Sequence, residues 1–270
     1  AKKLNSKGFT ATLDLLGEEL SNRKETNKIR KAYCDLLDGI ANYGIDCNIS
    51  LKLTALGLKF DEELCWDNLS VVLDKAREYN NFVRMDMEDS TVTDSTIRMC
   101  KKGKKYYSKC GTVLQAYMHR TSDDIDNLNT HNANIRLCKG AYKESSEIAY
   151  QDYQKIRNNY MINAEKIMDA GIFIGLATDD DWIIHKLENL LTRERFQEHD
   201  MESLNLFIDS VKEFSDRELY PYFQEMDATP AYHKDGTVIV HEQVQKVYFR
   251  VFYLEDIIHN LTHHSNPFLQ

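Results

Sequence analysis

The residues Ile135-Arg136-Leu137-Cys138-Lys139-Gly140 form a short apolar run that ends in a polar cluster. Four other stretches show the same pattern, at 49–54, 82–88, 113–117 and 172–179. Segments of roughly helix length separate these runs, as expected of a parallel β/α protein whose chemistry lies at the carboxyl ends of its strands. We therefore expect an α/β fold in which polar side chains from several strands meet at one edge of a sheet.

The alternation of runs and helical segments predicts the order of the elements. Strands are expected near 11–16, 47–56, 82–88, 110–117, 133–141 and 171–178, and helices near 24–42, 60–80, 91–107, 121–130, 143–170 and 181–197. A seventh strand is expected at 201–207 and an eighth at 237–241. Because this many alternations favour closure over an open sheet, residues 1–270 are predicted to form a single (β/α)8 barrel of the TIM type.

Size and charge agree with one barrel. The chain has 270 residues, of which 42% are hydrophobic and 29% charged, and a TIM barrel needs about 250 residues. A net charge of -9 argues against a nucleic-acid-binding protein, since phosphate binding needs a concentrated basic face. The lysines between 101 and 105 are interpreted as a solvated helix end. With no long apolar run and no apolar signal region at 1–7, the sequence predicts a cytoplasmic protein.

The cysteines and histidines do not have the spacing of a metal site. The six cysteines, at 34, 47, 65, 100, 110 and 138, form no CxxC pair, and the nine histidines form no HExxH motif. We expect buried, reduced thiols and no bound metal.

Two cations stand on the fifth predicted strand and at its exit. Arg136 and Lys139 are three residues apart, and Gly140 and Ala141 follow directly. Small residues let a large flat or phosphorylated ligand approach the backbone, and two cations beside such a turn suit a pyrophosphate or an anionic ring. An equally good interpretation is an ion pair from these cations to carboxylates at 86 or 88.

Other strand ends offer carboxylate, amide and hydroxyl groups. Asp86 and Glu88 project to one side of their strand, where they could do acid/base work, bind a divalent cation or neutralise nearby cations. Gln115 could hydrogen-bond a heteroaromatic ring or be a buried structural residue. Thr178 and Asp179 offer a hydroxyl and a carboxylate, or cap the following helix. The residues alone therefore predict a barrel enzyme that binds an anionic or flavin-like ligand.

Six of these stretches together resemble the proline dehydrogenase family. They are residues 13–18, 50–57, 86–89, 113–121, 136–144 and 176–179, which occur in the family's order over about residues 9–181. The resemblance implies a distorted (β/α)8 TIM-like barrel that binds FAD and oxidises L-proline to 1-pyrroline-5-carboxylate by hydride transfer to the flavin. It further implies a quinone as electron acceptor and transient contact with a membrane surface.

The resemblance also implies roles for single residues. Lys52 is similar to the barrel lysine that contacts the substrate carboxylate, and Asp86 and Arg136 resemble the catalytic pair around the proline amine and the flavin. The positions that match the FAD contacts of the family are Met87, Gln115, Lys139, Gly140, Ala141, Thr178 and Asp179.

The chain departs from the family pattern toward its C-terminal end. Asp179 stands where the family has a histidine, Leu204 replaces a glutamine, and His241 is the nearest counterpart of a tyrosine followed by a glycine-rich turn. The family's last helix has two arginines that clamp the proline carboxylate and then a glutamate, where this chain has only Arg250 and then Glu255. Loss of one bidentate guanidinium contact costs about 1.5–3 kcal/mol.

Two alternatives to a working proline oxidase therefore stay open. One is a flavin-binding or ligand-binding relative with impaired turnover, because of the missing arginine pair, Asp179 and Leu204. The other is an unrelated β/α-barrel lyase or isomerase that uses Lys52 as a Schiff-base nucleophile.

Overall fold

The structure, a computed structural model, describes residues 1–6, 8–15, 23–129, 133–191, 232–234 and 237–239. Its elements follow in the order α1 (Lys2–Asn5), β1 (Ala11–Leu13), α2 (Glu25–Tyr43), β2 (Cys47–Lys52), the 3-10 turn η1 (Thr54–Leu56), α3 (Glu62–Glu78), β3 (Val83–Asp86), α4 (Thr93–Tyr106), β4 (Cys110–Gln115), α5 (Thr121–Asn129), β5 (Asn134–Cys138), α6 (Tyr153–Asp169), β6 (Ile174–Ala177), α7 (Asp181–Leu191), β7 (Tyr232–Lys234) and β8 (Thr237–Ile239).

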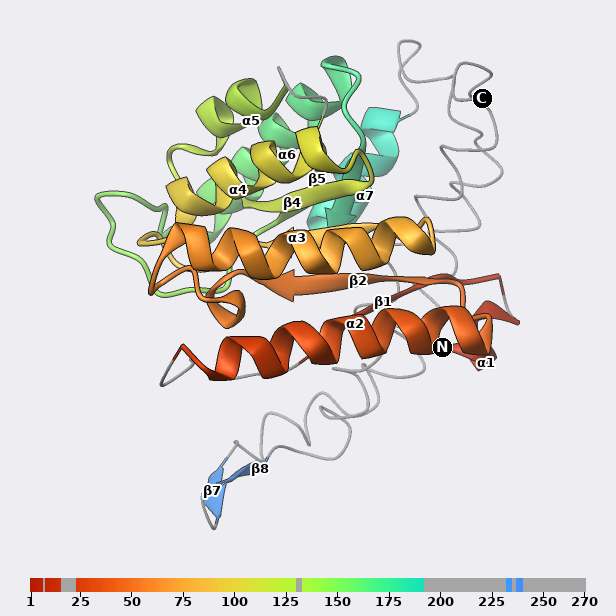
Figure 1. The fold of residues 1–270 in the computed structure, drawn as a ribbon. Coiled ribbons are helices and arrows are strands. Elements are labelled where there is room, and N and C mark those ends of the chain that lie inside the picture. Colours follow the sequence, from red (N-terminus) through yellow and green to blue (C-terminus); the bar gives the residue numbers. More distant parts are fainter. Residues whose placement is uncertain (7, 16–22, 130–132, 192–231, 235–236, 240–270) are drawn as a thin grey trace.

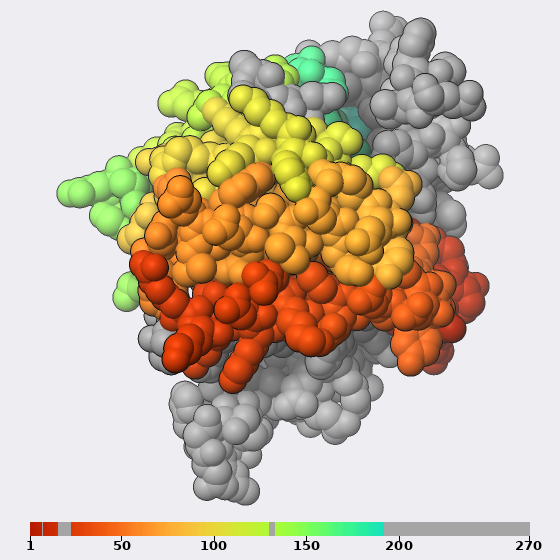
Figure 2. Space-filling model, in the orientation of Figure 1, coloured from red at the N-terminus to blue at the C-terminus, as the bar shows by residue number. Residues whose placement is uncertain are grey.

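Strands β1 to β6 form one parallel sheet in which each strand lies beside its neighbour in the chain. Between consecutive strands runs a helix, so the six predicted strands and the helices between them are confirmed. Helices α2, α3 and α4 lie side by side over the outer face of the sheet (Figure 1) and form a continuous surface there (Figure 2). This repeated β/α arrangement brings the carboxyl ends of all six strands to one edge.

The sheet is curled, as a barrel wall must be. Arg136 on β5 places Nη1 3.5 Å from Oγ of Ser50 on β2. In a flat sheet these two strands would lie about 14 Å apart, too far for side chains that stand out of the sheet to meet. The inner face therefore closes toward a barrel interior, and polar groups from distant strands meet inside it.

Helix α3 shows how the sequence builds the outer layer. Asp61 caps its first turn by accepting a hydrogen bond from the backbone N of Glu63 at 2.8 Å. Its buried apolar side chains, Leu69, Val72, Leu73 and Ala76, recur at the spacing of one helix face and are fully inaccessible to solvent. Burial of the leucine and valine side chains contributes about 1.5–3 kcal/mol each, which fixes the helix against the sheet.

The prediction that residues 237–241 form the eighth strand of the barrel is wrong. Residues 237–239 do form a strand, but β8 pairs antiparallel with β7 in a separate two-stranded sheet. Only two residues of sequence separate the two strands, and strands this close in the chain can pair only antiparallel. The predicted seventh strand at 201–207 lies outside the described residues.

The predicted helix at 143–170 begins about ten residues late, at Tyr153. Its expected first part instead pairs with the segment after β4, because the N of His119 donates to the O of Ile148 and the N of Tyr150 to the O of Tyr117. Asp152 then caps α6 by accepting from the N of Lys155 at 2.8 Å. Backbone groups used in these contacts cannot also form a helix.

Two smaller predictions can be compared directly with the structure. All six cysteines lie in the described residues as free thiols; four are buried, whereas Cys34 and Cys138 are partly exposed. The lysines at 101–105 occupy the C-terminal half of α4, with Lys104 and Lys105 in its last turn, where cations are favourable. Within the described ranges, no helix combines the length and apolar character that crossing a bilayer requires.

Candidate active site

An ion pair between two strands of the sheet lies at the centre of the site. Arg136 of β5 has Nη1 3.4 Å from Oδ1 of Asp86, the last residue of β3. The same carboxylate oxygen accepts a hydrogen bond of 2.5 Å from Ser50 of β2. The arginine side chain is 6% exposed and the aspartate 17%, so the pair is largely shielded from water. Of the two interpretations of Arg136, the ion pair to a barrel carboxylate is thus present in the structure.

A second carboxylate lies beside this pair and was not predicted. Asp14 directly follows β1, and its Oδ1 accepts a hydrogen bond of 2.9 Å from the buried phenol of Tyr33 on α2. Burial raises the pKa of Asp14, and the negative charge of Asp86 raises it further. A polar residue directly after a strand is the pattern used for the other five positions, so the same rule would have found Asp14.

Glu88 is held by the turn after β2. Its two carboxylate oxygens accept from the N of Thr54 at 3.1 Å and from the Thr54 hydroxyl at 2.5 Å. Burial raises the pKa of Glu88, against the lowering effect of these bonds and of the charges on Lys52 and Lys59. The structure thus gives Glu88 the role of joining two strand exits.

Gln115, at the end of β4, uses both ends of its amide within the protein. Nε2 donates to the O of Glu88 at 3.0 Å, and Oε1 accepts from the N of Ala141 at 3.3 Å. The side chain is 4% exposed. It therefore joins the exits of β3 and β5, which is the structural alternative offered by the sequence, and it leaves one amide hydrogen for a ligand.

Gly140 is required by packing as well as by backbone geometry. Its φ of +128° is disfavoured for other residues, and an added Cβ would lie 2.3 Å from Cδ1 of Tyr117. From the sequence, this glycine was expected to let a ligand approach the backbone, whereas in the structure the Tyr117 ring fills the space.

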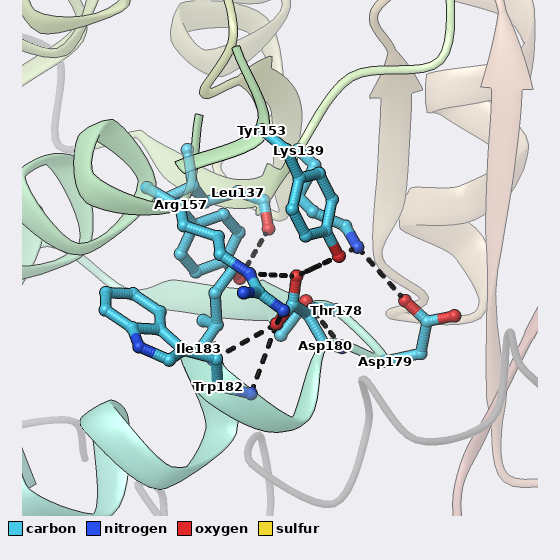
Figure 3. A network of polar contacts seen from close by, with 10 residues as sticks. Leu137, Lys139, Tyr153, Arg157, Thr178, Asp179, Asp180, Trp182 and Ile183 are labelled. Carbon is cyan, nitrogen blue, oxygen red and sulfur yellow. Dashed lines mark hydrogen bonds and ion pairs between the residues drawn. The ribbon is translucent and has the colours of Figure 1, made fainter. Parts of the chain in front are cut away.

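Lys139 lies at the rim, between two carboxylates of the segment after β6. Nζ is 3.5 Å from Oδ1 of Asp179 and 3.4 Å from Oδ2 of Asp180 (Figure 3). Glu88, one of the partners predicted for Lys139, instead accepts hydrogen bonds from Thr54. The ion pairs that Lys139 forms therefore differ from the predicted ones. Asp179, which takes the place of the family histidine, is 71% exposed in its side chain and is paired with this lysine.

The remaining predicted site residues are placed less centrally. Lys52 ends β2 and lies in register with Asp86 across the β2–β3 pair. Met87 is buried at the exit of β3, and the hydroxyl of Thr178 accepts from the N of Asp180 at 3.1 Å. Arg250, like Leu204, His241 and Glu255, lies outside the described residues.

The site thus gathers hydroxyl, carboxylate and cationic groups from β1 to β6 at one edge of the sheet. Lys52, Asp86, Gln115, Arg136 and Lys139 all lie on strands or exits of this edge, as predicted. Arg157 and Tyr153, which contact Asp180 from α6, were missed. They sit inside a helix, where no strand-end pattern marks them.

Comparisons with known proteins agree with this architecture. A sequence model of the family described as "Proline dehydrogenase" matches residues 1–173. Proline dehydrogenase 1 of Bacillus subtilis subsp. natto is 34% identical over 206 residues, which cover 76% of this chain and 68% of that protein. Proline dehydrogenase of Deinococcus radiodurans is 32% identical over 193 residues, 70% of this chain and 62% of that protein.

Solved structures show the same fold. Proline utilization A (PutA) from Bdellovibrio bacteriovorus, inactivated by N-propargylglycine, matches with a TM-score of 0.64 and 21% identity over 73% of this chain. A variant of PutA from Bradyrhizobium japonicum matches with a TM-score of 0.61 and 20% identity over 67% of this chain. The match spans 25% and 23% of those longer chains, respectively.

The described parallel sheet is accordingly part of a TIM-like β/α barrel. Neither a likeness of fold nor one short motif would decide the family alone. The family match covers well over half of the chain, and the identity to curated relatives extends over three quarters of it. This chain belongs to the proline dehydrogenase family.

Proposed function

We propose that this chain binds FAD at the carboxyl edge of β1–β6 and oxidises L-proline to 1-pyrroline-5-carboxylate, with a quinone as the electron acceptor. The observation that carries the proposal is the shielded cluster of Ser50, Asp86 and Arg136 in the barrel mouth. In a member of this family, a buried ion pair at the meeting point of three strands is better explained by a reaction site than by stability. Buried ion pairs contribute little to stability, because desolvation offsets their attraction.

The chemistry of the polar groups fits FAD. Arg136 stands inside the mouth and Lys139 at its rim, three residues further along the chain, with a side chain that is 27% exposed. We infer that the lysine takes the pyrophosphate and that the arginine lies toward the ring, with Met87, Gln115, Gly140, Ala141 and Thr178 along the cofactor. When bound, FAD supplies the two-electron acceptor that no protein side chain provides.

The substrate is a zwitterion, so its site needs both charges close together. Lys52 and Asp86 are register partners on β2 and β3, which places an ammonium and a carboxylate side by side at the mouth. We propose that Lys52, with Arg250, binds the proline carboxylate and that Asp86 faces the proline amine. Ser50 and Arg136 hold the Asp86 carboxylate in place through contacts to its Oδ1.

The test is the absorption spectrum of purified protein reconstituted with FAD, recorded before and after anaerobic addition of L-proline. We expect a visible flavin band that L-proline bleaches and D-proline leaves unchanged. Asp86→Asn should keep the band and lose the bleaching. A protein that takes up no FAD would refute the proposal.

Two further experiments test the proposed electron acceptor and the proposed membrane contact. Return of the flavin band on addition of a soluble quinone, at a rate above that with oxygen, supports the proposed acceptor. Sedimentation with vesicles of anionic phospholipid tests the proposed transient membrane contact of a cytoplasmic protein.

One alternative remains a defined outcome of this experiment. A chain that binds FAD but is not bleached by L-proline is the relative with impaired turnover, an outcome motivated by Asp179 in place of a histidine. The unrelated lyase or isomerase that uses Lys52 loses its support, because the chain belongs to the proline dehydrogenase family.

A further inference from the structure

Asp180 is the most completely surrounded carboxylate near the proposed cofactor rim. Its side chain has no exposed surface. Oδ2 accepts hydrogen bonds from the Tyr153 hydroxyl at 2.6 Å and from Nε of Arg157 at 2.9 Å (Figure 3). Nη2 of the same arginine lies 2.8 Å from Oδ1. The guanidinium also stacks over the Tyr153 ring at 4.3 Å, so both α6 side chains are fixed around the carboxylate.

The same carboxylate caps the next helix. Oδ1 accepts from the backbone N of Trp182 at 3.1 Å and of Ile183 at 3.4 Å, in the first turn of α7. Capping alone would be served by an asparagine or a serine. Arg157 and Lys139, the two cations that also contact this carboxylate, need a different explanation, because a helix cap does not require them.

Lys139 is shared between this buried carboxylate and an exposed one. Its Nζ lies 3.4 Å from Asp180 and 3.5 Å from Asp179, yet the Asp180 side chain has no exposed surface and that of Asp179 is 71% exposed. Water screens the exposed pair far more than the buried one. Asp180 is therefore the strong anchor of the ammonium, and Asp179 is a weak partner that a ligand anion can replace.

We propose that Asp180 is a positioning residue that holds the Lys139 ammonium at the rim for a cofactor phosphate, while Asp179 competes with that phosphate for the same ammonium. The inference rests on the proposed FAD site. Arg157 and Tyr153 hold the anchor in place from the α6 side, because both donate to Oδ2, the same oxygen that Lys139 approaches at 3.4 Å. Their hydrogen bonds outweigh the effect of burial and lower the pKa of Asp180, so the anchor is ionised at neutral pH.

The two neighbouring aspartates then have opposite effects, which makes a matched pair of substitutions. Asp180→Asn keeps an oxygen to cap α7 but removes the charge that holds Lys139. Asp179→Asn removes the competing charge and leaves the anchor. We expect FAD to bind about tenfold more weakly to the first variant, as for loss of a hydrogen bond to a charged group, and about two- to fivefold more tightly to the second, as for an exposed ion pair.

A readout that does not involve FAD tests the anchor itself. Lys139 of the protein without cofactor is acylated by an amine-reactive reagent, and Lys166 serves as internal reference because it has its own partner, Asp126, at 2.7 Å. Asp180→Asn should raise the labelling of Lys139 relative to Lys166 several-fold. A merely structural loosening of α6 would raise the labelling of both lysines. Asp180→Glu, which restores the charge, should recover part of the protection.

The outcomes separate the anchor from the proposed function. If the wild-type protein does not bind FAD, the proposed function falls, whatever the labelling shows. If the wild-type protein binds FAD but Asp180→Asn changes neither the labelling ratio nor the affinity, or if Asp179→Asn weakens binding, the positioning role is refuted. Should Asp180→Asn fail to fold, Tyr153→Phe takes its place. Tyr153 is 53% exposed, and this variant removes one donor to Oδ2, so the same changes are expected at smaller size.

Discussion

Replacement of Gly140 by alanine tests how the loop that carries the proposed cofactor contacts is built. The backbone at this residue has a φ of +128°, which costs about 1–3 kcal/mol for a residue with a side chain. The new Cβ would also lie 2.3–2.6 Å from three atoms of the Tyr117 ring. Overpacking of that kind costs about 1–3 kcal/mol more. We therefore expect Gly140→Ala to lower the free energy of unfolding by about 2–6 kcal/mol.

The matched control is Gly171→Ala. Gly171 also has a positive φ, +65°, but an added Cβ there meets nothing within 4 Å. Only the left-handed backbone is then penalised, by about 1–2 kcal/mol. Both variants and the wild-type protein are unfolded with urea, without cofactor, and followed by circular dichroism. The difference between the two glycine variants measures the contact with the ring.

A double-mutant cycle with Tyr117→Ala separates that contact from the backbone strain. Removal of the ring leaves room for the alanine, so the double variant should be about 1–3 kcal/mol more stable than the sum of the single effects predicts. Strict additivity would show that the ring moves aside without penalty. The explanation of Gly140 by packing against Tyr117 would then be wrong, and the close approach of a ligand would again be the better explanation of this glycine.

Three further predictions concern the neighbouring contacts. Glu88→Gln should stabilise the protein at neutral pH, because burial raises the pKa of Glu88 above its ordinary 4.5. The contribution of this carboxyl to stability is present below pH 4.5 and is lost as the pH rises through the higher folded-state pKa. The melting temperatures of the two proteins should therefore converge in acid. Ser50→Ala removes the hydrogen-bond donor to Asp86 and should lower the free energy of unfolding by about 1.5–3 kcal/mol. A urea-unfolding midpoint equal to that of the wild-type protein would contradict this prediction. Glu144→Ala releases both the N and the hydroxyl of Ser90, each 2.7 Å from the carboxylate, and should speed protease cleavage within residues 139–152 while leaving α2 protected.

The strand positions were predictable because each strand is an apolar run. The expected strand at 82–88 corresponds to Val83–Asp86 and the one at 110–117 to Cys110–Gln115. In the first case the sequence pattern extends past the strand into its polar exit. In the second, the two residues beyond the strand still donate backbone hydrogen bonds to the O of Cys138 and of Lys139. Pairing partners cannot be predicted in this way, and for that reason the strand at 237–239 was assigned to the barrel although it pairs with 232–234.

The site residues on strands and strand exits were predictable from the sequence pattern, whereas the site residues on helices were not. An ion pair from Arg136 to a carboxylate at 86 or 88 was one of two equally good interpretations of the sequence, and the structure contains the pair with Asp86. The late start of α6 was not foreseeable, since it depends on backbone hydrogen bonds to residues 117–119. Local sequence carries no information on such distant partners.

Asp180 illustrates the limit most clearly. In the sequence it is one of three consecutive aspartates, and helix capping explains it well. The structure confirms the cap, which uses Oδ1, and adds a second function of the same carboxylate, since Oδ2 accepts from Arg157 and Tyr153 of α6. A cap satisfies backbone donors, whereas a buried charge needs a cation. The full negative charge of Asp180 is therefore explained by Arg157 and Lys139, and a search for capping aspartates that have cations on a neighbouring helix would identify such anchors in other barrels.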